Sequence, residues 1–257
     1  MRAALSIGLP GTTAPETLRA LAPRLERLGF DAIWLNDVPG GDSLAGLRVV
    51  AEATERLGLA TGVIPIDRRP VGSLELAGIP PERTTIGIGS GGVRHPVAVV
   101  ADGVAELRTR TDAAIAVGAL GPRMRRLAAE LADAVVLNWL TPGAATEAMA
   151  DLRHDSRGRA ERVRGVVYAR TISDGAARAA LQKEADRYGS YASYAANFAR
   201  LGIQPIDATI DRSSALHAYD GIVDEIVLRA ITAGGTLEEL ERFAETTAQW
   251  RSEQAGA

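Results

Sequence analysis

Several residue types are missing or rare in this chain of 257 residues. It has no cysteine, which excludes disulfides, thiolate metal sites and cysteine nucleophiles. Its three histidines, His95, His154 and His217, are far apart in the sequence, so we predict no bound metal. Lys183 is the only lysine and falls in a predicted helix, which argues against Schiff-base chemistry. Aromatic residues make up only 4%, too few for platforms that stack bases or sugars.

Charge and hydrophobic runs set further limits. The net charge is −3, whereas nucleic-acid-binding proteins typically carry an excess of positive charge, so no nucleic-acid partner is expected. No apolar run reaches the ~18 residues of a membrane span, and the N-terminal apolar run is too short for a secretory signal. With 46% hydrophobic residues the chain can build a packed core. We therefore expect a soluble, cytoplasmic globular protein.

The chain alternates short apolar runs with amphipathic stretches. One short sequence motif occurs twice, 29 residues apart, at Glu26–Phe30 and at Glu55–Leu59. This spacing is the length of one βα unit. Predicted strands cover 3–9, 32–36, 60–64, 84–89, 113–119, 134–140, 163–169 and 225–230, and predicted helices cover 18–28, 44–57, 96–107, 122–131, 143–152, 176–200 and 237–249. About eight such units favour an α/β fold, a single (β/α)₈ TIM barrel spanning 1–257 as one domain. A doubly wound open sheet is the competing topology.

The segment Ala119–Trp139 carries the clearest functional signal. A helix is predicted to open at Pro122, a residue suited to the first turn because its missing N–H needs no partner there. Arg123, Arg125 and Arg126 crowd the positive end of this helix, where cations are disfavoured. A bound anion such as a phosphate would explain them. Three solvated arginines on an outer helix are the alternative.

A glycine-rich tract, Gly87–Gly92, follows one predicted strand and fits the pattern G-x-G-x-x-G. A dinucleotide-binding fold would also need an acidic residue at the end of the next strand. Asp112 instead precedes that strand. We therefore interpret the tract as a βα loop of a barrel, where glycines let the backbone approach a ligand closely. A simple tight turn is the alternative.

Five segments together resemble the luciferase-like monooxygenase family, whose members are (β/α)₈ enzymes that use flavin or deazaflavin. They are Leu28–Asp37, Arg56–Val63, Pro81–Gly91, Ala119–Pro142 and Asp224–Arg229. The fourth is the most specific, through its words ALGPRM and LNWLTP.

This resemblance implies where a cofactor binds. A non-proline cis peptide is implied at Gly62-Val63, and the turn Gly121-Pro122 would hold the cofactor phosphate. Asn138 and Trp139 would line the same cavity. The implied cofactor-binding residues are Gly62, Val63, Gly89, Ser90, Gly91, Gly121, Pro122, Arg123, Asn138 and Trp139.

The chain departs from the family at the position of a histidine that serves acid–base chemistry in many deazaflavin members. Here Val38 stands in its place, so we consider Asp37 or His95 as the catalytic proton donor. A carboxylic acid would need a raised pKa for this role. Asp37 could equally be a cap or a hydrogen-bond acceptor, and His95 a plain loop residue.

Two further segments leave alternatives open. The turn 67–69 could bind the acidic tail of a deazaflavin, or be merely solvated. The tyrosine-rich stretch Tyr188–Phe198 could cover the mouth of the barrel, or pack as one helix face.

The resemblance implies an oxidoreductase that transfers a hydride to or from a small organic substrate. Deazaflavin F-420 is the favoured cofactor and flavin mononucleotide (FMN) the second choice. A non-catalytic flavin-binding or partner subunit, and a non-redox barrel enzyme acting on a phosphorylated substrate, are the alternatives. A homodimer is expected from the family.

Overall fold

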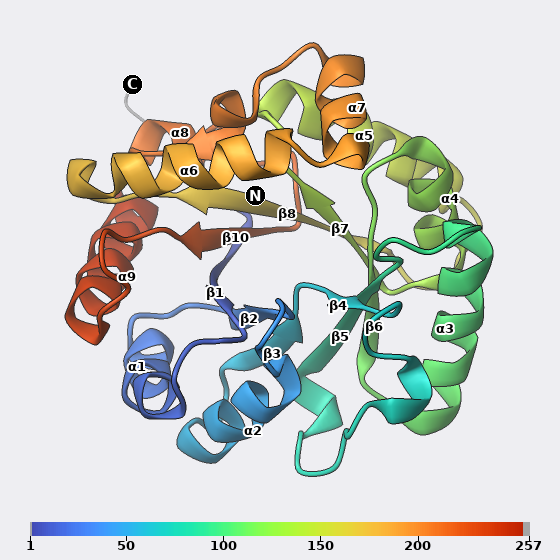
Figure 1. The fold of residues 1–257 in the computed structure, drawn as a ribbon, viewed down its shortest axis with the longest axis horizontal. Coiled ribbons are helices and arrows are strands. Elements are labelled where there is room, and N and C mark those ends of the chain that lie inside the picture. The colour runs from blue at the N-terminus through green and yellow to red at the C-terminus, as the bar shows by residue number, and fades with distance from the viewer. Residues whose placement is uncertain (1, 254–257) are drawn as a thin grey trace.

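Eight parallel strands close into a barrel surrounded by helices in the computed structural model, which describes residues 2–253 (Figure 1). In order around the ring they are β10 (Glu225–Ala230), β1 (Ala4–Pro10), β2 (Ala32–Asn36), β3 (Gly58–Thr61), β5 (Thr84–Gly89), β6 (Ala114–Gly118), β7 (Ala134–Asn138) and β8 (Arg164–Thr171). Pairing of β8 with β10 closes the ring. Two-residue strands, β4 (Ile64–Pro65) and β9 (Thr209–Ile210), extend it beside β5 and β8. The predicted (β/α)₈ barrel is confirmed, and the open sheet is excluded.

The helices follow the strands around the outside. They are α1 (Pro15–Arg27), α2 (Ser43–Ala53), α3 (Pro96–Arg110), α4 (Pro122–Leu131), α5 (Pro142–Asp155), α6 (Arg178–Gly189), α7 (Ala192–Leu201), α8 (Ser213–His217) and α9 (Leu237–Ser252). Short 3₁₀ helices are η1 (Val71–Ser73), η2 (Pro81–Arg83), η3 (Gly175–Ala177) and η4 (Pro205–Ala208). Proline opens α4 and α5 at the position where it needs no hydrogen-bond partner.

The lumen of the barrel is filled by two large aromatic side chains, Trp34 and Tyr168, each about 1% exposed. Small residues on the facing strands, among them Ala60, Ala116 and Ala134, leave room for them. The barrel is therefore a packed core and not a channel. A second, larger apolar layer lies between the barrel and its helices.

A buried polar cluster sits at the bottom of the lumen, where β10 begins. The Glu225 carboxylate is 3% exposed and accepts hydrogen bonds from Ser6 Oγ (2.6 Å) and Trp34 Nε1 (2.7 Å). Arg164 Nη1 lies 3.2 Å from the same carboxylate. Each polar group here has a partner, as a buried network requires.

The single helix predicted over 176–200 is wrong. The structure has two helices, α6 and α7, separated at Ser190 and Tyr191. Gly189 ends α6, and Tyr191 adopts an extended backbone with φ −79° and ψ 123°. Glycine and serine are poorer helix formers than the residues around them, so the chain can turn here. After the break, α7 lies beside α5 at the edge of the barrel (Figure 1), and several of its residues line the cavity.

Smaller differences concern element ends. Helix α2 stops at Ala53 and not at residue 57, because Thr54 is extended and its hydroxyl donates to the Val50 carbonyl (2.7 Å). Strand β3 begins at Gly58 and ends at Thr61, two to three residues earlier than predicted.

Within residues 2–253, no helix is long and apolar enough to cross a membrane. The same part of the chain has no group of three or more His, Cys, Asp or Glu side chains arranged to hold a metal ion.

Replacing Glu225 by leucine is expected to lower the free energy of unfolding by about 2–6 kcal/mol, because Trp34 and Ser6 each lose a buried acceptor at about 1–3 kcal/mol apiece. Glu225→Gln keeps an acceptor oxygen and should cost less. Urea unfolding measures both. Glu238→Gln, on an exposed ion pair of α9, is the control and should change stability by less than about 1 kcal/mol. Unchanged stability in Glu225→Leu would show that the cluster is dispensable.

Candidate functional site

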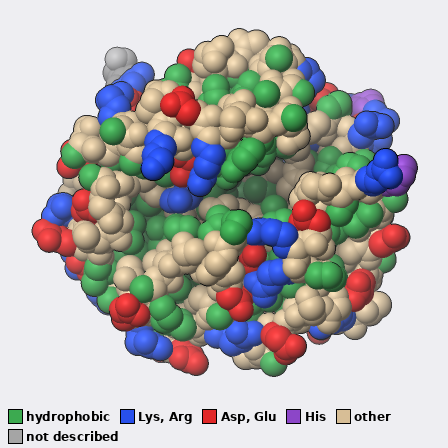
Figure 2. Space-filling view, in the orientation of Figure 1, with side chains coloured by type: hydrophobic (Ala, Val, Ile, Leu, Met, Phe, Trp, Pro, Cys, Tyr) green, Lys and Arg blue, Asp and Glu red, His purple; other side chains and the backbone are tan. Residues whose placement is uncertain are grey.

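A cavity of about 1090 Å³ opens at the carboxyl ends of the strands, the end at which barrels of this kind carry their sites. Figure 2 shows it as a hollow near the centre of this face, bordered by hydrophobic and basic side chains. Gly62, Gly89 and Gly121 all line it, although they follow three different strands. The volume lies just above the ~300–1,000 Å³ typical of small-ligand pockets, so the cavity can hold a large ligand.

Most of the residues singled out in the sequence line this one cavity: Asp37, Gly62, Val63, Gly89, Ser90, Gly91, Gly121, Pro122, Arg123 and Asn138. Two do not, and these are corrections. Trp139 is fully buried behind the wall, because its left-handed backbone (φ 56°) turns the ring into a cluster with Tyr188 and Phe198. His95 is an exposed residue preceding α3 and lies outside the lining.

The Gly62-Val63 peptide bond is cis, as the resemblance implies. The Asn36 side-chain amide donates to the Gly62 carbonyl. The Tyr168 hydroxyl donates to Asn36 Oδ1 (2.6 Å). Burial raises the pKa of Tyr168, so this phenol stays protonated and keeps Asn36 in one orientation.

The loop after β5 is held close to the turn after β4. Gly91 has a left-handed backbone (φ +60°), and a Cβ there would lie 1.9 Å from the Asp67 carboxylate. The Gly92 N–H donates to Asp67 Oδ2 (2.9 Å). Glycine is thus required at Gly91 by both conformation and space.

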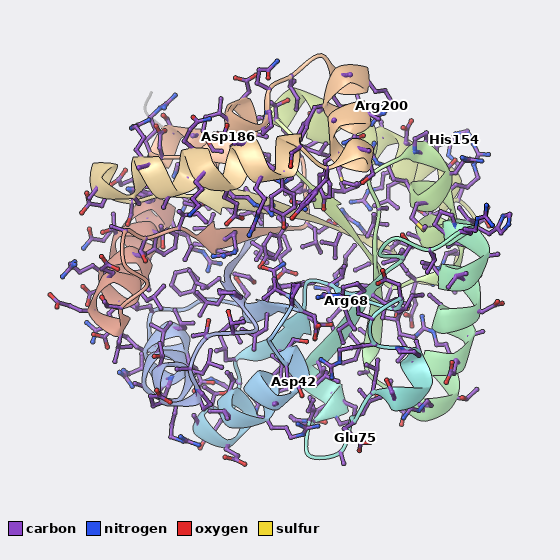
Figure 3. The ribbon with its side chains drawn as sticks, in the orientation of Figure 1. Asp42, Arg68, Glu75, His154, Asp186 and Arg200 are labelled. Carbon is purple, nitrogen blue, oxygen red and sulfur yellow. The ribbon has the colours of Figure 1, made fainter. Side chains whose placement is uncertain are left out.

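Asp37 is 6% exposed and fully engaged with protein partners. Its carboxylate forms an ion pair with Arg69 and accepts a hydrogen bond from Ser43 Oγ (2.8 Å). Arg68, labelled near the centre of Figure 3, donates to the Asp37 carbonyl (2.5 Å). In each of these side-chain contacts the Asp37 carboxylate is the acceptor, so its oxygens are engaged by protein donors. The turn 67–69 therefore stabilises the part of the cavity wall that contains Asp37. Binding of the acidic tail of a deazaflavin by this turn stays a prediction.

A second polar chain runs from α6 to the cavity through the fully buried Arg170. Burial alone would lower the pKa of Arg170, but Tyr188 and Glu184 raise it, so the guanidinium is charged. It donates to Glu184 Oε1 (2.9 Å) and to Asn138 Oδ1. Because Asn138 Oδ1 is occupied, its Nδ2 faces Tyr194 and donates to the phenol oxygen (3.1 Å). The Tyr194 proton is then free for an acceptor in the cavity that Tyr194 lines.

The tyrosine-rich stretch borders the cavity, but it does not form one helix face, because it is divided between α6 and α7. Tyr188 and Tyr194 pack with Phe198 and Trp139, and they also line the cavity. Tyr191 is 47% exposed at the break between the two helices.

The three arginines of α4 differ from one another. Arg123 is exposed and lines the cavity, whereas Arg126 faces Asp155 (3.9 Å). Arg125 is 7% exposed, and its Nε has no hydrogen-bond partner. No side chain caps the start of α4 at Gly121, where an added Cβ would meet no atom within 4 Å. An open, positively charged helix end thus borders the cavity.

Several lining residues were missed in the sequence: Asn36, Tyr168, Asn197 and Arg200. The position of Asn36 at the end of a predicted strand was a usable signal, because strand ends meet at the mouth of a barrel. Nothing local in the sequence indicates that α7 brings Asn197 and Arg200 to the same place.

Comparison with known proteins agrees with this architecture. Residues 3–114 match the model of the luciferase-like monooxygenase family. This match confirms the family resemblance over these residues, which make up less than half of the chain, and the solved structures below share its barrel fold. No curated protein matches the chain.

Solved structures of similar fold include three of known source. The coenzyme F-420 dependent tetrahydromethanopterin reductase of Methanopyrus kandleri is 14% identical, with a TM-score of 0.68 over 97% of this chain and 98% of that one. Monooxygenase RslO1 of Streptomyces bottropensis is 20% identical, with a TM-score of 0.66 over 97% and 98%. The oxygenating constituent of 3,6-diketocamphane monooxygenase from Pseudomonas putida, solved with FMN, is 11% identical, with a TM-score of 0.68 over 96% and 97%.

Burial, followed by the neighbouring Tyr188, raises the pKa of Tyr194 to about 12. Above pH ~10 the unfolded chain loses this proton while the folded protein keeps it, so stability is present below pH ~10 and falls as the pH rises toward 12. We expect the unfolding free energy of Tyr194→Phe to fall less steeply over this range, by up to about 1.4 kcal/mol per pH unit. Parallel slopes for the two proteins would contradict the buried, neutral phenol.

Proposed function

We propose that the chain is an oxidoreductase that binds deazaflavin F-420, or alternatively FMN, in this cavity and transfers a hydride to or from a small organic substrate. The convergence of Gly62, Gly89 and Gly121 on one cavity carries the proposal. It is supported by the family match over residues 3–114 and by neighbours of the same fold that are named for F-420 or solved with FMN.

The residues present suit such a cofactor at both of its ends. Gly62, Gly89 and Gly91 contribute only backbone to the cavity wall, and a flat ring can pack against that backbone. At Gly121 the start of α4 offers unfilled space, free backbone N–H groups and the positive end of the helix dipole, which suit a phosphate.

When bound, the cofactor supplies a ring that gives or accepts two electrons as a hydride. The chain itself excludes water through α7 and the packed aromatic residues beneath the cavity. Tyr194 offers its hydroxyl proton to an oxygen of the substrate, a role for which neither Asp37 nor His95 is placed. Asn36 and Asn138, each fixed by a buried partner, hold the wall in one arrangement.

We favour the deazaflavin because the sequence words around Ala60–Val63 and Ala119–Met124 resemble deazaflavin-dependent members more closely. A homodimer, a cytoplasmic location and a small-molecule substrate belong to the same proposal.

The non-redox alternative is less well supported by the described lining residues. A barrel isomerase or lyase needs a free acid or base in its cavity. Asp37 is the one carboxylate in the lining, and it is paired with Arg69. Lys183 lies exposed on α6 and outside the cavity.

The proposal is tested by titrating the purified protein separately with F-420 and with FMN, following cofactor fluorescence and thermal stability. We expect saturable binding of at least one, and oxidation of the reduced, bound cofactor by an organic acceptor. Absence of binding to both would refute the proposal. Binding with no turnover by any acceptor would instead favour a non-catalytic flavin-binding subunit.

Gly121→Phe is expected to weaken cofactor binding at least tenfold while the protein stays folded. Its backbone is extended (φ −100°, ψ 164°), which any residue adopts, and its Cβ would point into open space. The phenyl ring would then occupy the cavity. Gly143→Phe is the matched control, because Gly143 also starts a helix and also has open space, but it does not line the cavity. Equal binding by the two variants would place the cofactor elsewhere.

A further inference from the structure

Helix α7 presents an unusual group of polar side chains to the cavity. Asn197 is 6% exposed, and its Nδ2 has no hydrogen-bond partner. Its Oδ1 is already occupied, because Arg200 Nη2 donates to it (2.7 Å). A buried amide with an unpaired donor costs about 1–3 kcal/mol, so this donor is expected to have an acceptor when the site is filled.

Arg200 is close to the start of α4. Burial, and next the positive charge of Arg200, lower the pKa of Arg125, while Asp151 acts to raise it. The positive charges of Arg125 and Arg200 are therefore close enough to repel each other. Among the described residues, no carboxylate lies within 4.0 Å of Arg123, Arg125 or Arg200. Figure 3 shows Arg200 on α7, on the side of the molecule where α4 and α5 lie.

Positive charge that no carboxylate of the described residues neutralises thus gathers from two helices around one side of the cavity. Helix α4 contributes its uncapped N-terminus and Arg123, and α7 contributes Arg200 and the free amide of Asn197. Like charges at short range repel unless an anion lies between them. Hydrogen bonds between such donors and a phosphate are of the strong, charge-assisted kind.

We infer that Asn197 and Arg200 close the site over the phosphate of the bound cofactor, so that α7 and the start of α4 form a two-sided phosphate clamp. This inference rests on the proposed function and adds α7 to it. The clamp makes the protein selective for a phosphorylated cofactor over its dephosphorylated chromophore.

The test compares the dissociation constants of FMN and riboflavin, and of F-420 and its dephosphorylated chromophore, by fluorescence quenching. In the wild type we expect the phosphorylated form to bind at least tenfold more tightly. Arg200→Gln and Asn197→Asp should remove most of this preference by weakening the phosphorylated form about 10- to 100-fold. Binding of the dephosphorylated form should change less than about threefold.

Asn197→Asp is nearly isosteric and gains an ion pair with Arg200, so it should fold. It also places a negative charge where the phosphate would lie. Lys183→Gln is the control, because it removes one exposed positive charge from the neighbouring helix α6 outside the cavity. It should leave the preference unchanged. Added salt should reduce the preference of the wild type more than that of Arg200→Gln.

Inorganic phosphate alone provides an independent test. Its binding is measured as a rise in the melting temperature of the wild type and of the two variants. A preference for the phosphorylated cofactor that survives in both variants overturns the clamp and leaves the proposed function standing. If no cofactor binds, but phosphate stabilises the wild type and not the variants, the clamp stands and the proposed function fails. If neither cofactor nor phosphate has an effect, both are wrong.

Discussion

The closed ring of parallel strands is the constraint on which the rest of the structure depends. Pairing of β8 with β10 brings the carboxyl ends of all eight strands to one face. Residues separated by more than a hundred positions, such as Asn36 and Tyr168, therefore meet in one hydrogen bond. The same closure gathers the loops after β3, β5 and β6 around a single cavity. The chemistry of the site is thus a consequence of backbone pairing between strands whose last residues, such as Asn36, Gly89 and Asn138, line the cavity.

Much of the fold could be predicted because its signals are local. Strands β2, β5 and β10 and helix α4 have the expected bounds, since each is an apolar run or an apolar stripe that can be read from local sequence. The glycines of the cavity could be predicted for a similar reason. Each follows a strand, and strand ends converge in a barrel.

The contributions of α6 and α7 could not be predicted in this way, because they depend on where a helix is carried after it forms. The break before Tyr191 is caused by two poor helix formers, Gly189 and Ser190, whereas the spacing of the apolar residues alone predicted a continuous helix. Trp139 shows the same limit: its neighbour Asn138 lines the cavity, but a left-handed backbone turns Trp139 away. Asp37 was correctly placed in the wall, yet its ion pair with Arg69 involves a residue 32 positions away.

The packing of Trp34 and Tyr168 within the lumen has a consequence for how ligands enter and leave the cavity. These rings block the axis of the barrel below the cavity, so no ligand reaches the cavity from that side. A ligand bound at the bottom of the cavity must therefore bind before a ligand that lies above it, and must leave after that ligand. Two ligands sharing this dead end would exchange in a fixed sequence, the outer one leaving first, without any moving gate to enforce the order.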